Sequence, residues 1–230
     1  MNISIYLLLG SLDIFSIILS TFCFFSLPFK EYLKEVLIIS FSLSLSSYFV
    51  RVVFEAALFD TLIQVILLIL LIRFLVKVKT TLSILMAAIG TMAYISFQPL
   101  VIFLYDLTGI IHAAASLSAE TWGARTVQLT TDVLMVLASL ILIRFGLGIT
   151  YFARPPHSMY LKERLSKNFF LILLIACIGI AITCLFMFLL LQIKFLLIPP
   201  IAFLVFLVLV MLVLRRDYRS HVLGFREENR

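Results

Sequence analysis

The residues of this chain that could do chemistry are a few charged and amide side chains inside long apolar segments. The stretch 48–60 reads YFVRVVFEAALFD, which places Arg51 four residues before Glu55 and nine before Asp60. A helix brings side chains four residues apart onto one face, so Arg51 and Glu55 can form an ion pair. Charges in such a setting bind an ionic ligand, carry a proton or join helices to each other.

Nearly all polar side chains within the apolar segments fall in the half that we expect to face the outside. Asp13 is the deepest, because ten residues at 1.5 Å each place it roughly 15 Å into its segment, near the midplane of a bilayer. A charge there costs about 2.5–3.5 kcal/mol, so these groups should face the inside of a bundle and pair. The candidate ligand-binding residues are Asp13, Arg51, Glu55, Gln64, Gln98, Gln128 and Asp132.

Arg51 is the one basic residue well inside the outer half of a segment, and we expect it to pair with an acid. An ion pair with Glu55 on the same helix contributes only about 0.2–0.5 kcal/mol, too little to offset the burial of two charges. The expected partner therefore comes from another helix, with Asp132 as first choice and Asp13 as second. The polar residues then form interhelical contacts alone, a polar cavity open to the outside, or a proton or ion path. A path should continue into the inner half, where charged residues lie only near the edge.

A proline inside one of the apolar segments marks a second place for a polar cavity. Pro99 has no N–H to donate to the carbonyl of Ile95, so we expect a kink in that helix. Gln98 beside it either lines a cavity opened by the kink or lies next to a bend without function.

The composition shows what kind of element holds these side chains. Of 230 residues, 63% are hydrophobic and 13% are charged, with a mean hydropathy of +1.21. Soluble domains are about 45–50% apolar and about 25% charged. Apolar runs of about 18 or more residues recur along the chain, as in proteins with membrane-spanning helices. The sequence predicts an all-α, polytopic transmembrane bundle in a lipid bilayer. The net charge of +6 does not indicate nucleic-acid binding, because the basic residues are scattered at the ends of apolar runs.

Seven spans are predicted, at about residues 3–26, 36–58, 60–77, 81–105, 126–151, 169–192 and 195–214. Six spans remain if the second and third form a single span. Residues 1–214 would form a single transmembrane domain and 215–230 a short basic cytoplasmic tail. The opening MNISIYLLLGSLDIF has no basic stretch before its apolar run, so we expect no cleavable signal peptide.

The distribution of basic residues predicts the orientation. Of the 18 lysines and arginines, all but Arg51, Arg125 and Lys194 fall at alternate ends of the seven spans. Cytoplasmic loops carry the excess of basic residues, so the N-terminus is expected outside and the C-terminus in the cytoplasm. Merging the second and third spans would break this alternation, which favours seven spans over six.

Patterns of common enzyme and metal sites are missing from the sequence. We find no HExxH, no GxSxG and no phosphate-binding loop. The cysteines, Cys23, Cys177 and Cys184, lie in apolar segments without a metal-binding spacing. We therefore expect no enzymatic activity, no cofactor and no metal site.

Three stretches carry a likeness to a known family: LLGSLDIFSIIL (8–19), YFVRVVFE (48–55) and ARPPHSMYLKE (153–163). With the predicted spans and the polar outer half, they resemble the membrane sensor region of Agr-type peptide-pheromone receptor histidine kinases. The chain also resembles small multi-pass membrane proteins of Gram-positive, spore-forming bacteria. Only sixteen residues follow the last predicted span, and a catalytic domain needs on the order of 100, so we expect no kinase domain.

The resemblance implies a receptor-like protein of a bacterial cytoplasmic membrane whose output is a partner protein, such as a kinase. We expect a non-enzymatic module that binds an external small ligand, a peptide or a partner helix through its polar outer half. The alternatives are a small transporter or the membrane subunit of a transport complex, and a structural subunit that stabilises a partner.

Overall fold

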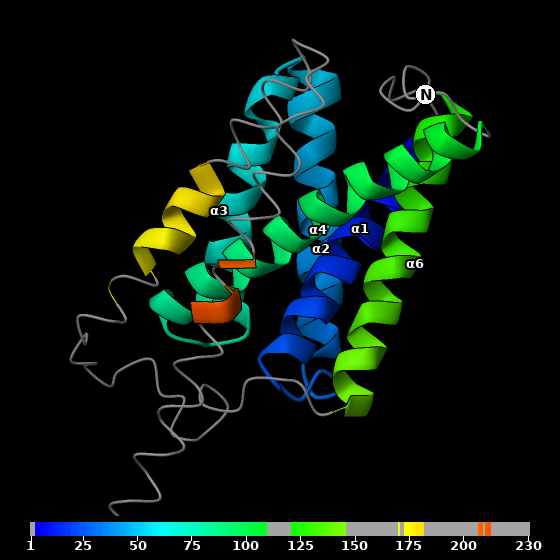
Figure 1. Cartoon of the computed structure of the whole chain (residues 1–230). Coiled ribbons are helices and arrows are strands. Elements are labelled where there is room, and N and C mark those ends of the chain that lie inside the picture. The colour runs from blue at the N-terminus through cyan, green and yellow to red at the C-terminus, as the bar shows by residue number, and fades with distance from the viewer. Residues whose placement is uncertain are drawn as a thin grey trace, which may run out of the picture.

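The computed structural model describes residues 3–109, 121–145, 170, 173–181, 207–208 and 210–212. In this part of the chain the fold is entirely helical, as expected (Figure 1). The helices are α1 (Ile3–Phe24), α2 (Leu33–Tyr48), a π-helical turn η1 (Phe49–Val53), α3 (Ala57–Leu75), α4 (Thr80–Thr108) and α6 (Trp122–Phe145).

Four helical segments in the described part of the chain are long and apolar enough to cross a membrane: Ile3–Phe24, Leu33–Val53 (α2 together with η1), Thr80–Tyr105 and Trp122–Phe145. Their outward side chains are also apolar, as the exposure of Leu8, Phe41, Leu104 and Ile141 illustrates. Large apolar surfaces of this kind are stable in lipid and not in water. The chain is therefore a membrane protein.

The described helices coincide in position with the first five predicted segments, and each begins within four residues of its predicted start. Four of these segments are long and apolar enough to cross a membrane, and α3 is not among the four. The sixth and seventh spans and the tail 215–230 lie largely outside the described residues. The parts of those spans that are described, residues 173–181 and 210–212 among them, are helical. Ala176 belongs to the buried core.

Helices that follow one another along the described chain alternate in direction (Figure 1). α1 and α2 are antiparallel, because Tyr6 lies beside Ser47, and the backbone carbonyl of Leu7 accepts a bond from Ser44. α1 and α6 are parallel, since their contacts advance along both helices together. As a result, α1, α3 and α6 begin at the same end of the bundle, where η1 and α4 end. We call it the N-terminal end.

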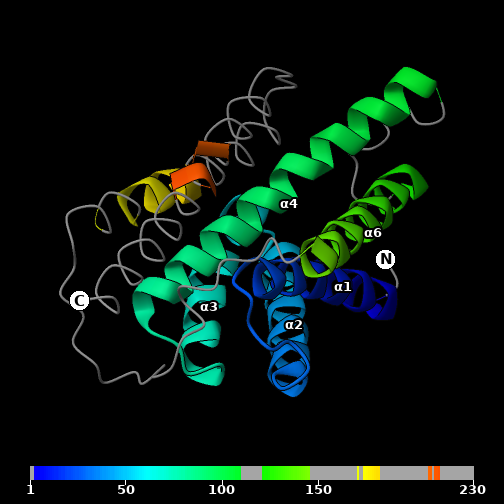
Figure 2. The same cartoon turned by 60° about the horizontal axis from the view of Figure 1, so that its bottom comes forward.

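Helix α1 is central, because it packs against α2, α4 and α6 (Figure 2). Small residues allow α1 and its neighbouring helices to approach each other closely. A Cβ added at Gly10 would lie 2.7 Å from Oγ of Ser44 in α2. Small residues at helix contacts are typical of membrane proteins, where backbones approach closely. The largest fully buried side chains are Ile18, Phe22, Phe25, Ile39, Leu43, Ile72, Leu85, Met86, Met92 and Met135.

Replacing Gly90 by alanine should destabilise the bundle, because α1 and α4 touch there. A Cβ at this position would lie 2.3 Å from Oγ1 of Thr21 and 2.9 Å from Cγ2 of Ile17. Overpacking costs about 1–3 kcal/mol, more than the helix propensity that alanine adds. Thermal unfolding of the purified protein in detergent should show a lower midpoint for Gly90→Ala. A higher midpoint would mean that α1 and α4 lie further apart.

The segment between α2 and α3 is irregular. η1 ends with a bond from the N–H of Phe54 to the carbonyl of Phe49, and Glu55 follows with φ of 53°. This left-handed conformation is uncommon for a residue other than glycine, and it turns the chain back toward α2. α2 and α3 are therefore separate, adjacent antiparallel helices. By contrast, α4 continues through Pro99 to Thr108 without ending at the proline.

Candidate functional site

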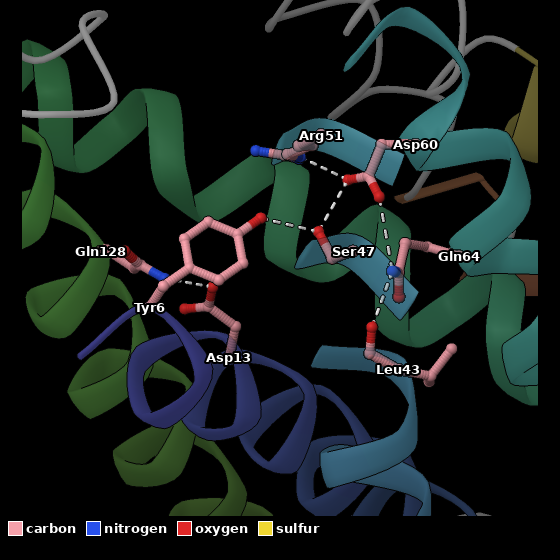
Figure 3. A network of polar contacts seen from close by, with 8 residues as sticks. All are labelled: Tyr6, Asp13, Leu43, Ser47, Arg51, Asp60, Gln64 and Gln128. Carbon is pink, nitrogen blue, oxygen red and sulfur yellow. Dashed lines mark hydrogen bonds and ion pairs between the residues drawn. The ribbon is translucent and has the colours of Figure 1, made fainter. Parts of the chain in front are cut away.

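Polar side chains from six helical elements, α1, α2, η1, α3, α4 and α6, gather toward the N-terminal end of the bundle. They form two groups, which together we call the polar cluster. The Arg51 group consists of Tyr6, Ser47, Arg51, Asp60 and Gln64. The acid-pair group consists of Asp13, Ser16, Tyr94, Gln128 and Asp132. Figure 3 shows the first group with Asp13 and Gln128 of the second.

The Arg51 group is organised around the carboxylate of Asp60 at the start of α3. Its Oδ2 accepts Nε–H of Arg51 at 2.5 Å and the hydroxyl of Ser47 at 3.1 Å, and its Oδ1 accepts the Gln64 amide at 3.4 Å. Because the Ser47 proton is used here, the hydroxyl of Tyr6 donates to Ser47, at 3.0 Å. The same Gln64 nitrogen donates to the carbonyl of Leu43 at 2.9 Å. These bonds connect α1, α2, η1 and α3.

Arg51 has bonding capacity that Asp60 does not use. Its side chain is 44% exposed, whereas that of Asp60 is 1% exposed. Only Nε of the guanidinium bonds to Asp60, and its two terminal NH2 groups have no partner among the described residues. In Figure 3 the outer nitrogen points away from Asp60.

The prediction that Arg51 pairs with Asp132 or Asp13 was wrong. Arg51 pairs with Asp60, and not with Asp132, Asp13 or Glu55; this is the one ion pair between described residues. The reason is the turn after η1, which sends α3 back along α2 and brings its first turn next to Arg51. Glu55 lies within the turn itself and is exposed.

The acid-pair group lies between α1, α4 and α6. Oδ1 of Asp13 accepts the Tyr94 hydroxyl at 2.9 Å, and Oδ2 accepts the amide of Gln128. Oδ1 of Asp132 accepts the Ser16 hydroxyl at 2.9 Å. Asp132 is 7% exposed, and its Oδ2 is buried without a hydrogen-bond partner among the described residues.

Farther from the N-terminal end than the two acids, further hydroxyl groups lie along the contact between α1 and α6. The Ser20 hydroxyl lies 3.4 Å from the carbonyl of Met135. The Ser139 hydroxyl lies 2.9 Å from that of Ser20 and 2.7 Å from the carbonyl of Met135 in its own helix. Ser16, Ser20 and Ser139 thus extend the polar line from the acids toward the other end of the bundle. Serine interactions across membrane helices are worth about 0.6–2 kcal/mol each.

Five of the seven predicted site residues lie in the polar cluster, and two lie outside it. Arg51 and Gln64 are in one group; Asp13, Gln128 and Asp132 are in the other. Glu55 is exposed in the turn after η1. Gln98 is half-buried and makes no hydrogen bond with another described residue.

Among the cluster residues that were not predicted, Asp60 is an acid at the start of a predicted span, with a signal as strong as that of Asp13, and the others carry weaker signals in the sequence. Ser47 lies four residues before Arg51, on the same face of a helix, and Tyr94 lies four before Gln98. A tyrosine or serine in an apolar segment is ordinary, because both are tolerated there with one hydrogen bond. Only the packing of α1 against α4 shows that Tyr94 faces Asp13.

The described residues offer neither a metal site nor a cysteine pair. No group of three or more histidine, cysteine or acidic side chains is placed to hold a metal ion in this part of the chain. Cys23 is buried and Cys177 is exposed, both as free thiols. A groove of about 440 Å³ lies between α1 and α2. It is lined by Ser11, Leu12, Phe15, Leu37, Ser40 and Phe41, none of which is a predicted site residue.

Comparison with known proteins yields no relative. No family model matches the chain, and no curated protein or solved structure is significantly similar to it. A function must therefore be inferred from the side chains and their geometry.

Proposed function

We propose that this chain is a non-enzymatic, receptor-like protein of a bacterial cytoplasmic membrane that binds an external ligand at the Arg51 group. In this proposal it has seven spans, with its N-terminus outside and its C-terminus in the cytoplasm. The ligand is a small molecule, a peptide or a partner helix that carries an anionic group, and a membrane or kinase partner receives the signal.

The distribution of charges in the bundle supports this orientation. Six described basic residues lie at the end opposite the N-terminal end: Lys30, Lys34, Arg73, Lys77, Lys79 and Arg144. Of the basic residues that the structure describes, only Arg51 and Arg125 lie at the N-terminal end. Because basic residues accumulate on the cytoplasmic side, the polar cluster belongs to the outer half. α3, with 19 residues, is about 28 Å long and suits a further span.

The observation that carries the ligand proposal is the half-used guanidinium of Arg51. Asp60 neutralises its charge and holds Nε, while the terminal NH2 groups have no partner among the described residues. A guanidinium binds carboxylates through two parallel N–H bonds, so these nitrogens suit an anionic ligand group. π-Helical turns such as η1, which carries Arg51, are frequent at functional sites.

Replacing Arg51 by lysine should separate ligand binding from folding. Lysine keeps the positive charge next to Asp60 but lacks the second nitrogen group that a carboxylate would engage. The probe is a set of short apolar peptides with a free C-terminal carboxylate, and binding is measured by the thermal shift of the purified protein. We expect Arg51→Lys to weaken binding about 10- to 150-fold, because bonds to a charged group contribute about 1.5–3 kcal/mol.

Two controls accompany this measurement. Amidated versions of the same peptides should bind weakly, because they lack the carboxylate. Arg125→Lys changes the other arginine at the same end, which stacks on Trp122, and should leave binding unchanged. If amidated and free peptides bind equally well, Arg51 does not recognise an anion.

The line of hydroxyls between α1 and α6 favours transport as a second candidate function. It extends from the acid pair toward the opposite end of the bundle, as a path across the membrane would require. In that case the chain is a small transporter or the membrane subunit of a transport complex. Proteoliposomes with the purified chain should then take up a labelled peptide, or protons under a potential, whereas a receptor binds without uptake.

A further inference from the structure

Two acids, from α1 and from α6, meet inside the bundle. Asp13 and Ser16 lie on one face of α1, and Gln128 and Asp132 lie on one face of α6. Asp13 bonds to Gln128, and Ser16 bonds to Asp132, so the four side chains form two adjacent rungs across the helix contact. Because the two rungs are adjacent along both helices, the carboxyl groups of Asp13 and Asp132 lie next to each other in the contact between α1 and α6.

The hydrogen bonds of the two acids are unequal. Both oxygens of Asp13 accept a donor, one from Tyr94 and one from Gln128, as suits an ionised carboxylate. Asp132 accepts a donor at Oδ1 only, from Ser16. Its Oδ2 is buried without a partner in the described part of the chain, although Asp132 is only 7% exposed. A buried ionised oxygen without a donor is costly.

The charged groups around the pair do not compensate two negative charges. From η1, Arg51 lies within electrostatic range of Asp13, but its Nε is bound to Asp60 of α3. The titratable group that faces the pair from α4 is the hydroxyl of Tyr94, which donates to Asp13. On α1, the hydroxyl of Tyr6 bonds to Ser47 and not to either acid. On α6, the guanidinium of Arg125 lies over the ring of Trp122. Two adjacent carboxylates in an apolar setting do not both ionise.

We propose that the acid pair is a proton-binding site, with the proton on Oδ2 of Asp132 and donated to the carboxylate of Asp13. One proton removes one of the two like charges and turns Oδ2 of Asp132 into a hydrogen-bond donor, with the carboxylate of Asp13 as its acceptor. The pair then joins α1 to α6 through a carboxyl–carboxylate bond, and Tyr94 adds α4 to it. Two of the surrounding groups, Tyr94 and Gln128, donate hydrogen bonds to Asp13, as suits a carboxylate. Such donors disfavour a bound metal ion at this position, because metal ligands must offer lone pairs.

Proton binding makes the stability of the bundle depend on pH. An aspartate in water is ionised at neutral pH, so the folded chain holds one more proton than the unfolded chain. The free energy of unfolding therefore falls as the pH rises, and the unfolding equilibrium shifts by up to about tenfold per pH unit. This site is independent of the ligand site proposed at Arg51, because its geometry involves other side chains.

The test is infrared spectroscopy of the purified full chain, combined with thermal unfolding between mildly acidic and alkaline pH. At neutral pH the wild type should show the carbonyl stretch of a buried protonated carboxyl group, and Asp132→Asn should lack it. The asparagine can place its oxygen toward Ser16 and its NH2 toward Asp13, so it imitates the protonated acid. We expect Asp132→Asn to fold with an equal or higher midpoint and to lose the pH dependence of unfolding.

Two further variants decide which acid holds the proton. Asp13→Asn places an amide against Tyr94 and Gln128, both of which donate there, so its midpoint should be lower than that of Asp132→Asn. Glu55→Gln, an exposed acid outside the polar cluster, should leave the band and the pH dependence unchanged. A wild type without the band would overturn the proton site, as would unfolding that responds to sodium at constant pH. A lower midpoint for Asp132→Asn than for Asp13→Asn would place the proton on Asp13.

Discussion

Replacing Arg51 by alanine should lower the free energy of unfolding by about 2–4 kcal/mol. Removing one member of a buried ion pair costs about 3–5 kcal/mol, because the other charge stays buried and uncompensated. The expected loss here is somewhat smaller, since Arg51 is 44% exposed, and Ser47 and Gln64 still donate to Asp60. Denaturant or thermal unfolding of the purified protein in detergent measures the change.

A double-mutant cycle identifies the partner. Arg51→Ala and Asp60→Ala should couple by about 1–3 kcal/mol, because each removes the same ion pair and the double variant buries no unpaired charge. Arg51→Ala combined with Asp132→Ala should be additive to within about 0.5 kcal/mol. Arg125→Ala serves as the control for removing an arginine at the same end. Coupling of Arg51 to Asp132 in place of Asp60 would show that α3 does not pack against η1.

The sequence predicted the helices well, because a membrane leaves few choices. A span needs about 20 apolar residues, and every backbone polar group within it must bond inside the segment. The apolar runs therefore located α1, α2, α3, α4 and α6 to within a few residues at their starts. Helix propensity and capping added little to this prediction.

The partner of Arg51 could not be predicted in the same way, because it depends on a local turn. A regular helix from residue 48 to residue 58 would carry Arg51 and Glu55 on one face. Instead η1 and the left-handed conformation at Glu55 end the helix early. Asp60 then becomes the nearest acid, although nine residues separate it from Arg51. Residues 48–60 contain no glycine or proline, so no turn is predicted there from the sequence.

The polar contacts between distant helices were predicted in part. Asp13, Gln128 and Asp132 stand out because charged and amide groups are costly in lipid and must find partners. Tyr94 and the serines do not stand out, since one hydrogen bond, in many cases to a carbonyl four residues earlier, satisfies them. Ser96 and Thr131 are satisfied in this way, whereas the Ser16 hydroxyl lies within hydrogen-bonding distance both of the Asp13 carbonyl in its own helix and of Asp132 across in α6. Helix packing decides which hydroxyls join the cluster.

The second prediction with a large effect concerns the orientation of the chain in the membrane. It follows from the distribution of basic residues between the two ends of the bundle. A reporter that is active only in the cytoplasm should be active when fused after Lys79, Lys167 or Arg230, and silent after Asp60 or Gly123. The fusion after Asp60 retains α1 and α2, and its reporter should be outside. The fusion after Lys79 also retains α3, which returns the chain to the side of the membrane where Lys30 and Lys34 lie.

The pair of fusions after Asp60 and Lys79 tests α3 directly. Only 19 residues separate the two points, so a change from silent to active requires that this short helix crosses the membrane. A second reporter that folds only outside the cytoplasm should give the opposite pattern, and this distinguishes a silent fusion from a degraded one. Activity of the cytoplasmic reporter after Gly123 would contradict the seven-span orientation and would place the polar cluster on the cytoplasmic side. An external ligand could not then reach Arg51.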